Sequence, residues 1–341
     1  MKFGLFGGAV ANKSADTADS KGYDGFVDLI IEAEKLGYES IFMVEHHFTG
    51  GGQVSASLNL LTYIAAKTEK IRLGTSVTVL PWHNPVLLAE QTATLDLLSG
   101  GRLDFGVGKG YRDMEYKGFC IPREEALERF QESIEVIKKA WTSEERFSHD
   151  GKFWQFDDII VEPYTIQEPH PPLWTAAGTD ESIARVAESD MNVLFDQFAS
   201  FERTEERLKV WQKACAASGR GFDPMEVGLA RGLTITLSEE EYQDALKKRD
   251  VRVTKMIEKF GALPGLVKDE PESYSDPILD MEEAALIGNP DKIIERLKIL
   301  ESMGFTHILI LIPDNIETLQ IFASEVMPEF REEKTEIISA A

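Results

Sequence analysis

The sequence predicts an α/β protein built as a closed (β/α)₈ barrel, the TIM-barrel fold, with an insertion after strand seven. Short apolar or β-branched runs alternate with stretches of helical spacing, and there are eight such pairs. The expected strands are residues 1–6, 39–44, 71–80, 102–108, 172–177, 192–196, 227–237 and 306–312. An open doubly wound sheet has the same local pattern but usually fewer strands, and it is the alternative.

The helices are expected after each strand, with sequence signals at their ends. In the first, Phe26, Leu29, Ile30 and Ala33 recur at helical spacing, and Gly37 ends the pattern. A proline stands in the first turn of the third. The expected helices are residues 22–36, 56–67, 85–98, 123–141, 180–188, 202–218, 290–303 and 316–327.

Two stretches interrupt this rhythm. Residues 147–172 hold the turn sequence His-Asp-Gly-Lys between two short aromatic or β-branched runs, which predicts a hairpin. Residues 238–286 form a long polar insertion, and residues 261–280 within it are a candidate lid or, alternatively, a surface loop. The whole chain, 1–341, is expected to be one domain.

Composition excludes several kinds of partner. The net charge of −23 disfavours nucleic acid and anionic membranes. Cys120 and Cys215 are too few for a disulfide framework, which suggests a reducing compartment. No apolar run reaches the roughly 18 residues of a membrane span, and no signal peptide is evident. We expect a soluble, cytoplasmic protein.

Residues with titratable side chains follow the second expected strand. Glu45, His46 and His47 stand at its end, and neighbouring residues on an extended segment point to opposite sides. One histidine should therefore face the barrel mouth, where it could transfer protons or donate hydrogen bonds. A metal site is poorly supported, because adjacent histidines cannot easily hold one ion. The alternative is that both histidines are structural.

Two further strand ends carry small residues. Thr75, Ser76 and Val77 could let a flat ring lie against the backbone, or could belong to a plain buried strand. Gly106, Gly108 and Gly110 surround Lys109, which indicates an anion site or only a sharp turn of the chain. This segment lacks the spacing of a Walker loop or a dinucleotide fingerprint.

The end of the fifth strand could bind phosphate. Gly178, Thr179 and Ser182 lead into a helix whose free N–H groups suit an anion. The alternative is an ordinary helix cap made by Thr179 or Asp180. Aromatic residues near strand ends suggest an apolar substrate pocket, although they could equally be core: Trp82, Tyr111 and Phe195.

Together these motifs resemble the luciferase-like flavin monooxygenases, the family of the bacterial luciferase α subunit, over nearly the whole chain. The matching segments are Met-Lys-Phe-Gly-x-Phe at the start, Glu-His-His-Phe-Thr at 45–49, Leu-Asp-x-Leu-Ser-x-Gly-Arg at 95–102, and Ile-Gly-Asn-Pro at 287–290. The resemblance implies a TIM barrel that binds reduced FMN (FMNH₂) supplied by a separate NAD(P)H:flavin reductase. Oxygen would then form a C4a-peroxyflavin that oxidises a small organic substrate such as an aldehyde or ketone.

The resemblance also implies residue roles. His46 matches the catalytic histidine, and Phe6 should pack near the isoalloxazine. The Ser76–Val77 bond falls at a non-prolyl cis peptide under the flavin, and Thr75 precedes it. The phosphate positions are Lys109, Arg129, Gly178, Thr179 and Ser182. A homodimer through the second and third helices is expected.

Two departures from luciferase stand beside these matches. Lys109 replaces an arginine, which keeps the positive charge but loses the planar guanidinium that can donate two parallel hydrogen bonds to a phosphate. Gly108 replaces a reactive cysteine. Light emission is therefore not predicted. Two alternatives remain open: an enzyme of the same fold that transfers hydride with the deazaflavin F420, and a non-catalytic flavin-binding protein.

Overall fold

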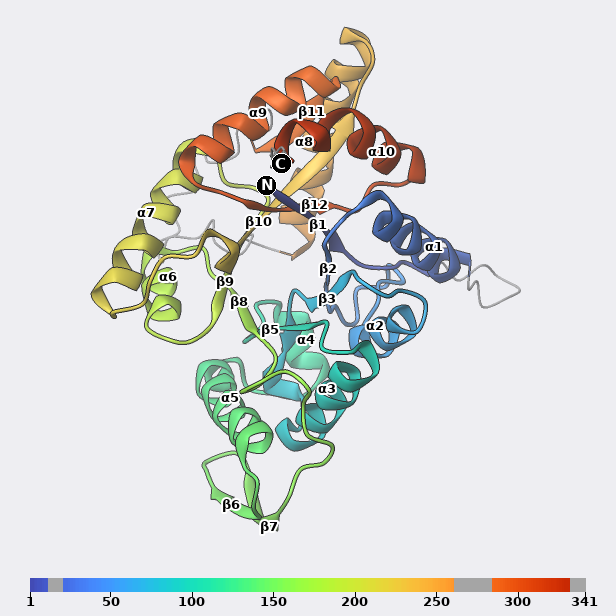
Figure 1. Ribbon diagram of the computed structural model, residues 1–341. Coiled ribbons are helices and arrows are strands. Elements are labelled where there is room, and N and C mark those ends of the chain that lie inside the picture. Colours follow the sequence, from blue (N-terminus) through green and yellow to red (C-terminus); the bar gives the residue numbers. More distant parts are fainter. Residues whose placement is uncertain (12–20, 261–283, 332–341) are drawn as a thin grey trace, which may run out of the picture.

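Eight parallel strands form a closed ring in the computed structural model, which describes residues 1–11, 21–260 and 284–331 (Figure 1). β10 pairs with β9 on one side and with β12 on the other, so the ring has no open edge. The (β/α)₈ prediction is confirmed, and the open sheet is excluded. The ring strands are, in spatial order, β1 (Lys2–Gly7), β2 (Ser40–Met43), β3 (Arg72–Thr75), β5 (Leu103–Gly108), β8 (Leu173–Ala176), β9 (Asn192–Phe195), β10 (Val227–Ile235) and β12 (His307–Leu311).

The helices surround this ring, and several begin where the sequence signals them (Figure 1). Asn84 and Asn289 accept backbone N–H bonds at the starts of α3 and α9, and a proline follows each of them. No helix in the described ranges is long and apolar enough to cross a membrane. The surrounding helices are α1 (Lys21–Leu36), α2 (Ser57–Ala65), α3 (Pro85–Ser99), α5 (Ala126–Thr142), α6 (Asp180–Ala187), α7 (Phe201–Ala217), α9 (Pro290–Met303) and α10 (Ile316–Ile321).

The expected third strand is interrupted, and the expected hairpin is present. β4 (Thr78–Val79) continues beyond β3 and pairs with β5, and the Ser76–Val77 peptide bond between β3 and β4 is cis, as the resemblance implies. β6 (Phe147–Asp150) and β7 (Gln155–Ile159) pair antiparallel, which confirms the hairpin.

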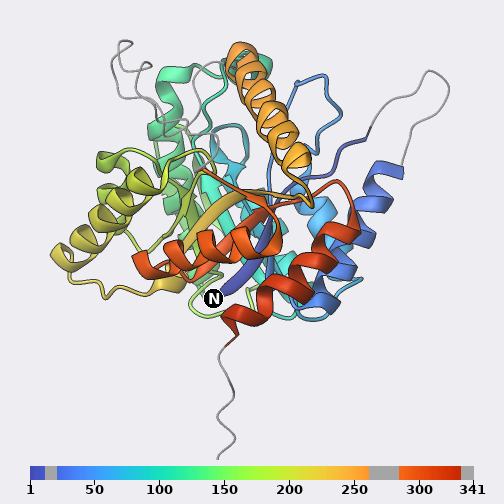
Figure 2. The same ribbon diagram turned by 90° about the horizontal axis from the view of Figure 1, so that it is seen from above.

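The insertion after β10 contains two elements that the sequence analysis does not predict. α8 (Glu239–Phe260) is polar in overall composition, although Tyr242, Leu246 and Val253 recur at helical spacing and are buried or half-buried, and β11 (Ala285–Gly288) has only four residues. β11 pairs in parallel with β10 outside the ring. α8 stands at the end of the barrel opposite the chain's N-terminus (Figure 2). The candidate lid, 261–280, lies outside the described residues.

Large side chains fill the barrel interior. Phe42 and Trp174 meet edge to face at 5.3 Å between ring centroids, beside Leu194 and Leu309. Gly74 makes this possible, because a Cβ there would lie 2.5 Å from the Phe42 ring. The inner layer is therefore a packed core rather than a pore.

Nearer the amino ends of the strands the interior is polar. Two nitrogens of Arg72 donate to the Asp104 carboxylate at 2.7 and 2.8 Å, and the Trp174 indole donates to Asp104 as well. This bidentate pair neutralises the charges inside the barrel.

Replacing Gly74 with alanine tests the packing of the interior. We expect Gly74→Ala to lower the free energy of unfolding by ~1–3 kcal/mol, because Phe42 has no room to retreat from the new methyl group. The measurement is urea denaturation. Gly25→Ala is the matched control: Gly25 is exposed in α1 with no atom within 4 Å of an added Cβ, so this change should stabilise by about 0.5–1 kcal/mol. Equal effects of the two changes would contradict the packing argument.

Candidate active site at the barrel mouth

His46 lies three residues beyond the end of β2 and is held by two neighbours. Its Nε2 is 3.2 Å from Nη2 of Arg112, and its Nδ1 is 3.5 Å from Oε1 of Glu115. A guanidinium can only donate, so Nε2 accepts and the proton of the neutral ring resides on Nδ1, facing Glu115. The surroundings thus define one tautomer.

The same surroundings favour the neutral form of His46. Burial is the main cause that lowers the pKa of His46; Glu115 opposes the shift, and the positive charge of Arg112 reinforces it. At neutral pH the imidazole is uncharged and can accept a proton.

Arg112 and Glu115 come from the loop after β5 and the first turn of α4 (Asp113–Gly118). Both are buried. Arg112 Nε also donates to the Tyr111 hydroxyl at 3.2 Å, and Glu115 accepts the backbone N–H of His47 at 2.9 Å. The predicted residues His46 and Tyr111 are therefore joined through Arg112. Sequence reasoning missed Arg112 and Glu115, whose only signal was that they closely follow the glycine-rich end of β5.

Glu45 organises the wall beside this site. It is 3% exposed and accepts hydrogen bonds from His47 at 2.9 Å and from Trp82 and His83 at 3.0 Å each. Burial alone would raise the pKa of Glu45, but the bonds from His47, His83 and Trp82 outweigh it and lower the pKa to about 2. Glu45 is therefore an ionised carboxylate that fixes three side chains.

The two adjacent histidines have different environments. His47 packs edge to face against Phe119 at 4.8 Å, while the Trp82 ring stacks on Phe119 at 5.0 Å. His47 is thus part of an aromatic wall, whereas His46 contacts Arg112. Within the described residues, no group of three or more His, Cys, Asp or Glu side chains is arranged to hold a metal ion.

The chemistry of the rim suits an apolar, flat ring. Phe6 and Val77 are half-buried and pack on the inner cluster. A Cβ on Gly108 would lie 2.4 Å from Val77, so a cysteine could not replace this glycine without a shift of Val77. The buried Thr75 hydroxyl donates to the Gly106 carbonyl at 2.6 Å, which ties β3 to β5, and contact of Thr75 with the flavin stays a prediction. The isoalloxazine of a flavin fits a surface of this kind.

Four of the five predicted phosphate residues lie at two neighbouring strand ends. Lys109 is exposed directly after β5, and Gly178 and Thr179 follow β8, the strand that pairs with β5. Thr179 caps α6 by accepting the Ser182 N–H at 3.2 Å, and Ser182 Oγ donates back to the Thr179 carbonyl at 2.8 Å. The helix cap that was the alternative is therefore present at Thr179, and a phosphate there stays a prediction.

Arg129, the fifth predicted phosphate residue, interacts with residues away from this helix cap. Its Nε donates to Glu125 at 2.8 Å, and its guanidinium lies 4.4 Å from the Phe153 ring centroid, beside the β6–β7 hairpin. No contact links it to Lys109 or Thr179 in the described part of the chain.

Phe195 is core rather than pocket. The inward residue of β9 is Leu194, so Phe195 points outward, is 2% exposed and packs against Phe305 at 6.3 Å. The prediction that Phe195 lines a substrate pocket is corrected, because the strand's alternation turns it toward the helices.

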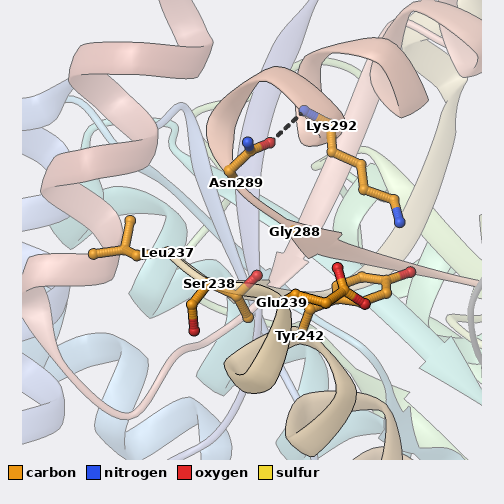
Figure 3. Close-up of a pocket in the computed structure, with 8 residues that line it drawn as sticks. Leu237, Ser238, Glu239, Tyr242, Gly288, Asn289 and Lys292 are labelled. Atoms are coloured by element: carbon orange, nitrogen blue, oxygen red, sulfur yellow. Dashed lines mark hydrogen bonds between the residues drawn. The ribbon is translucent and has the colours of Figure 1, made fainter.

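A pocket of about 210 Å³ lies away from these residues, where α8 begins beside α9 (Figure 3). The Lys292 ammonium lies 3.8 Å from the Tyr242 ring centroid, and Asn289 accepts the Lys292 backbone N–H. This pocket contains none of the predicted site residues. Its lining residues are Thr236, Leu237, Ser238, Glu239, Tyr242, Gly288, Asn289 and Lys292.

Comparison with known proteins agrees with this geometry. Residues 1–307 match the family described as luciferase-like monooxygenase. The oxygenase component of the flavin-dependent trigonelline monooxygenase of Acinetobacter baylyi is 28% identical, over 98% of this chain and 97% of that protein. An F420-dependent glucose-6-phosphate dehydrogenase of Kineococcus radiotolerans is 27% identical, over 89% and 92%. The crystal structure of the monooxygenase RslO1 from Streptomyces bottropensis superposes with a TM-score of 0.83 at 23% identity, over 97% of this chain and 100% of that one. The chain belongs to the luciferase-like monooxygenase family.

Proposed function

We propose that this protein is the oxygenase component of a two-component system, which receives FMNH₂ from a separate NAD(P)H:flavin reductase and uses O₂ to oxidise a small organic substrate. The observation that carries the proposal is the neutral, half-buried His46 held between Arg112 and Glu115 at the barrel mouth. The trigonelline monooxygenase relative, matched along nearly the full length of both chains, supports the choice of an oxygenase.

Different residues would bind the flavin, transfer the proton and line the substrate space. Phe6 and Val77 would support the flavin ring, and Ser76 lies in the cis peptide beside it. Lys109 would hold the phosphate, together with Gly178, Thr179 and Ser182. Bound FMNH₂ would supply the activation of oxygen. His46 would accept or deliver a proton at Nε2, and Tyr111 and Trp82 would wall the substrate space.

An F420-dependent hydride transfer is the second candidate, because relatives of this chain include F420-dependent dehydrogenases. The two candidates differ in oxygen use: hydride transfer with F420 consumes no O₂, whereas the oxygenase consumes one O₂ for each product formed. A flavin-binding protein without activity would instead retain oxidised FMN and form no oxygen-dependent product.

Substitution of His46 tests its role. We expect His46→Ala to lower kcat/KM for product formation by roughly 10²–10⁴-fold while leaving FMNH₂ binding within a few-fold, because the imidazole moves protons rather than anchoring the flavin. Product yield with a flavin reductase and anaerobic FMNH₂ titration measure the two effects. Turnover equal to that of the unaltered protein would contradict the assignment.

The pH dependence should follow His46. Since the pKa of His46 lies below its ordinary value of 6.5, activity should be constant at neutral pH and fall only as the ring gains a proton at lower pH. Glu115 raises the pKa of His46, so Glu115→Gln should move this acid limb to still lower pH. Asp113→Asn, an exposed carboxylate on the same short helix, should leave the limb in place. If the acid limb of the activity profile moves to higher pH in Glu115→Gln, the assignment of this limb to His46 is refuted.

A homodimer through α2 and α3 forms part of the proposal. These helices expose large apolar side chains: Tyr63 at 52%, Leu87 at 55% and Leu98 at 64%. Leu98→Asp should shift the protein toward monomer in light scattering, because it places a charge on the apolar face. The exposed Leu237, at 78%, lies at the other side of the ring, and Leu237→Asp should leave the mass unchanged. A monomeric unaltered protein would rule out this face as a dimer interface.

A further inference from the structure

The side chain of Arg249 extends from α8 to the carboxyl-end half of β10 in the barrel wall. Its Nη1 lies 2.9 Å from where a Cβ of Gly232 would stand, and Gln197 Oε1 lies 3.8 Å from the same point. Gly228, four residues earlier on β10, faces the inner cluster, because a Cβ there would lie 2.8 Å from Leu194. Residues four apart on a strand share a face, so Gly232 also faces inward and the Arg249 guanidinium lies at the inner edge of the mouth.

The guanidinium of Arg249 uses few of its five donors. Nη2 donates to the Gln197 carbonyl at 3.2 Å. The Nε of Arg249, like that of Arg231, is buried with no hydrogen-bond partner among the described residues, so the distinguishing feature of Arg249 is where its guanidinium lies. Burial and then the charge of Arg252 lower the pKa of Arg249 to about 10, so it remains protonated at neutral pH. No carboxylate in the described ranges pairs with it, although the chain has 59 Asp and Glu residues.

Other arginines of the barrel contrast with this one. Arg72 is paired with Asp104 and Arg207 with Asp196, both at 2.7 Å. Arg231, buried on the outer side of β10, donates to the Thr204 hydroxyl and to the Asp196 carbonyl oxygen. Arg249 differs from these arginines because its guanidinium faces the mouth. In the described part of the chain, the backbone carbonyl of Gln197 is its hydrogen-bond partner.

We propose that Arg249 binds the carboxylate of the substrate, so that the substrate class is small organic anions. The inference deepens the proposed function and rests on it. Gly232 contributes by leaving room for the guanidinium, which offers the planar fork that suits a carboxylate. In the ring, β10 is separated from β2 by β12 and β1, so the anion would be held across the mouth from His46.

A phosphate presents the same chemistry, and the flavin carries one. The predicted phosphate residues lie at β5 and β8, whereas Arg249 lies against β9 and β10. We therefore assign the carboxylate to the substrate, and the experiment below separates the two sources of the anion.

The experiment compares acids with their neutral amides on the full-length protein. The probes are benzoate, nicotinate and N-methylnicotinate (trigonelline), each beside its amide, titrated by calorimetry with the protein in the presence of FMN. In the unaltered protein at least one acid should bind about tenfold or more tightly than its amide, as expected for charge-assisted hydrogen bonds. Arg249→Gln should remove this preference, and Gly232→Ala, which displaces the guanidinium, should weaken it.

Arg252→Gln is the matched control, since it removes an exposed charge of the same helix and should preserve the preference for acids. The absence of any acid preference in the unaltered protein, or its survival in Arg249→Gln, would overturn the proposal. Anaerobic titrations with reduced FMN and reduced riboflavin test the flavin phosphate as the other source, because only FMN carries a phosphate. If Arg249→Gln weakens the binding of reduced FMN but not of reduced riboflavin, and does not change acid binding, the anion is the flavin phosphate and the substrate role is refuted. If FMNH₂ fails to bind the unaltered protein while the acid preference depends on Arg249, the oxygenase proposal fails and the anion site stands.

Discussion

Hydrogen bonding between β9 and β10 closes the ring of parallel strands, and this closure places every strand's carboxyl end at one rim. Segments far apart in the sequence meet there: the loop after β2 with His46, the loop after β5 with Arg112, and α8 with Arg249. The interior below the rim is filled by Phe42 and Trp174, whose packing requires glycine at position 74. A solid core beneath an open rim confines binding to the mouth.

Buried carboxylates organise the mouth on one side. Glu45 accepts from three side chains, and Glu115 accepts from the His47 backbone and faces the His46 ring. Each bond that Glu45 accepts helps to hold its charged form inside the protein, and the charged form in turn fixes the donors. His47 and Trp82 are thereby fixed in position, whereas His46 is held by Arg112 and Glu115, which set its tautomer.

The chain is acidic because its 59 Asp and Glu residues outnumber its 36 Lys and Arg residues, so a cation at the rim without a carboxylate partner is informative. Lys109 stands where β5 ends, next to β8 and the start of α6. Arg112 points at His46, and Arg249 points at the wall formed by β9 and β10. In the proposals above, Lys109 would hold the flavin phosphate and Arg249 the substrate anion, while Arg112 holds His46.

The cis peptide at Ser76–Val77 was implied only by the resemblance to a known family. The sequence by itself determined the barrel, the position of His46 at the end of its strand and the helix cap at Thr179. These features follow from periodicity and from local motifs, which act within a few residues of one another. Only the tertiary structure decided which side chains meet. Arg112 and Glu115 are 66 and 69 positions from His46, Phe195 is turned outward by the alternation of its strand, and Arg249 meets β10 and the loop after β9 only because α8 packs there. Such contacts depend on how the ring closes, because closure brings strand ends together whatever their distance along the chain.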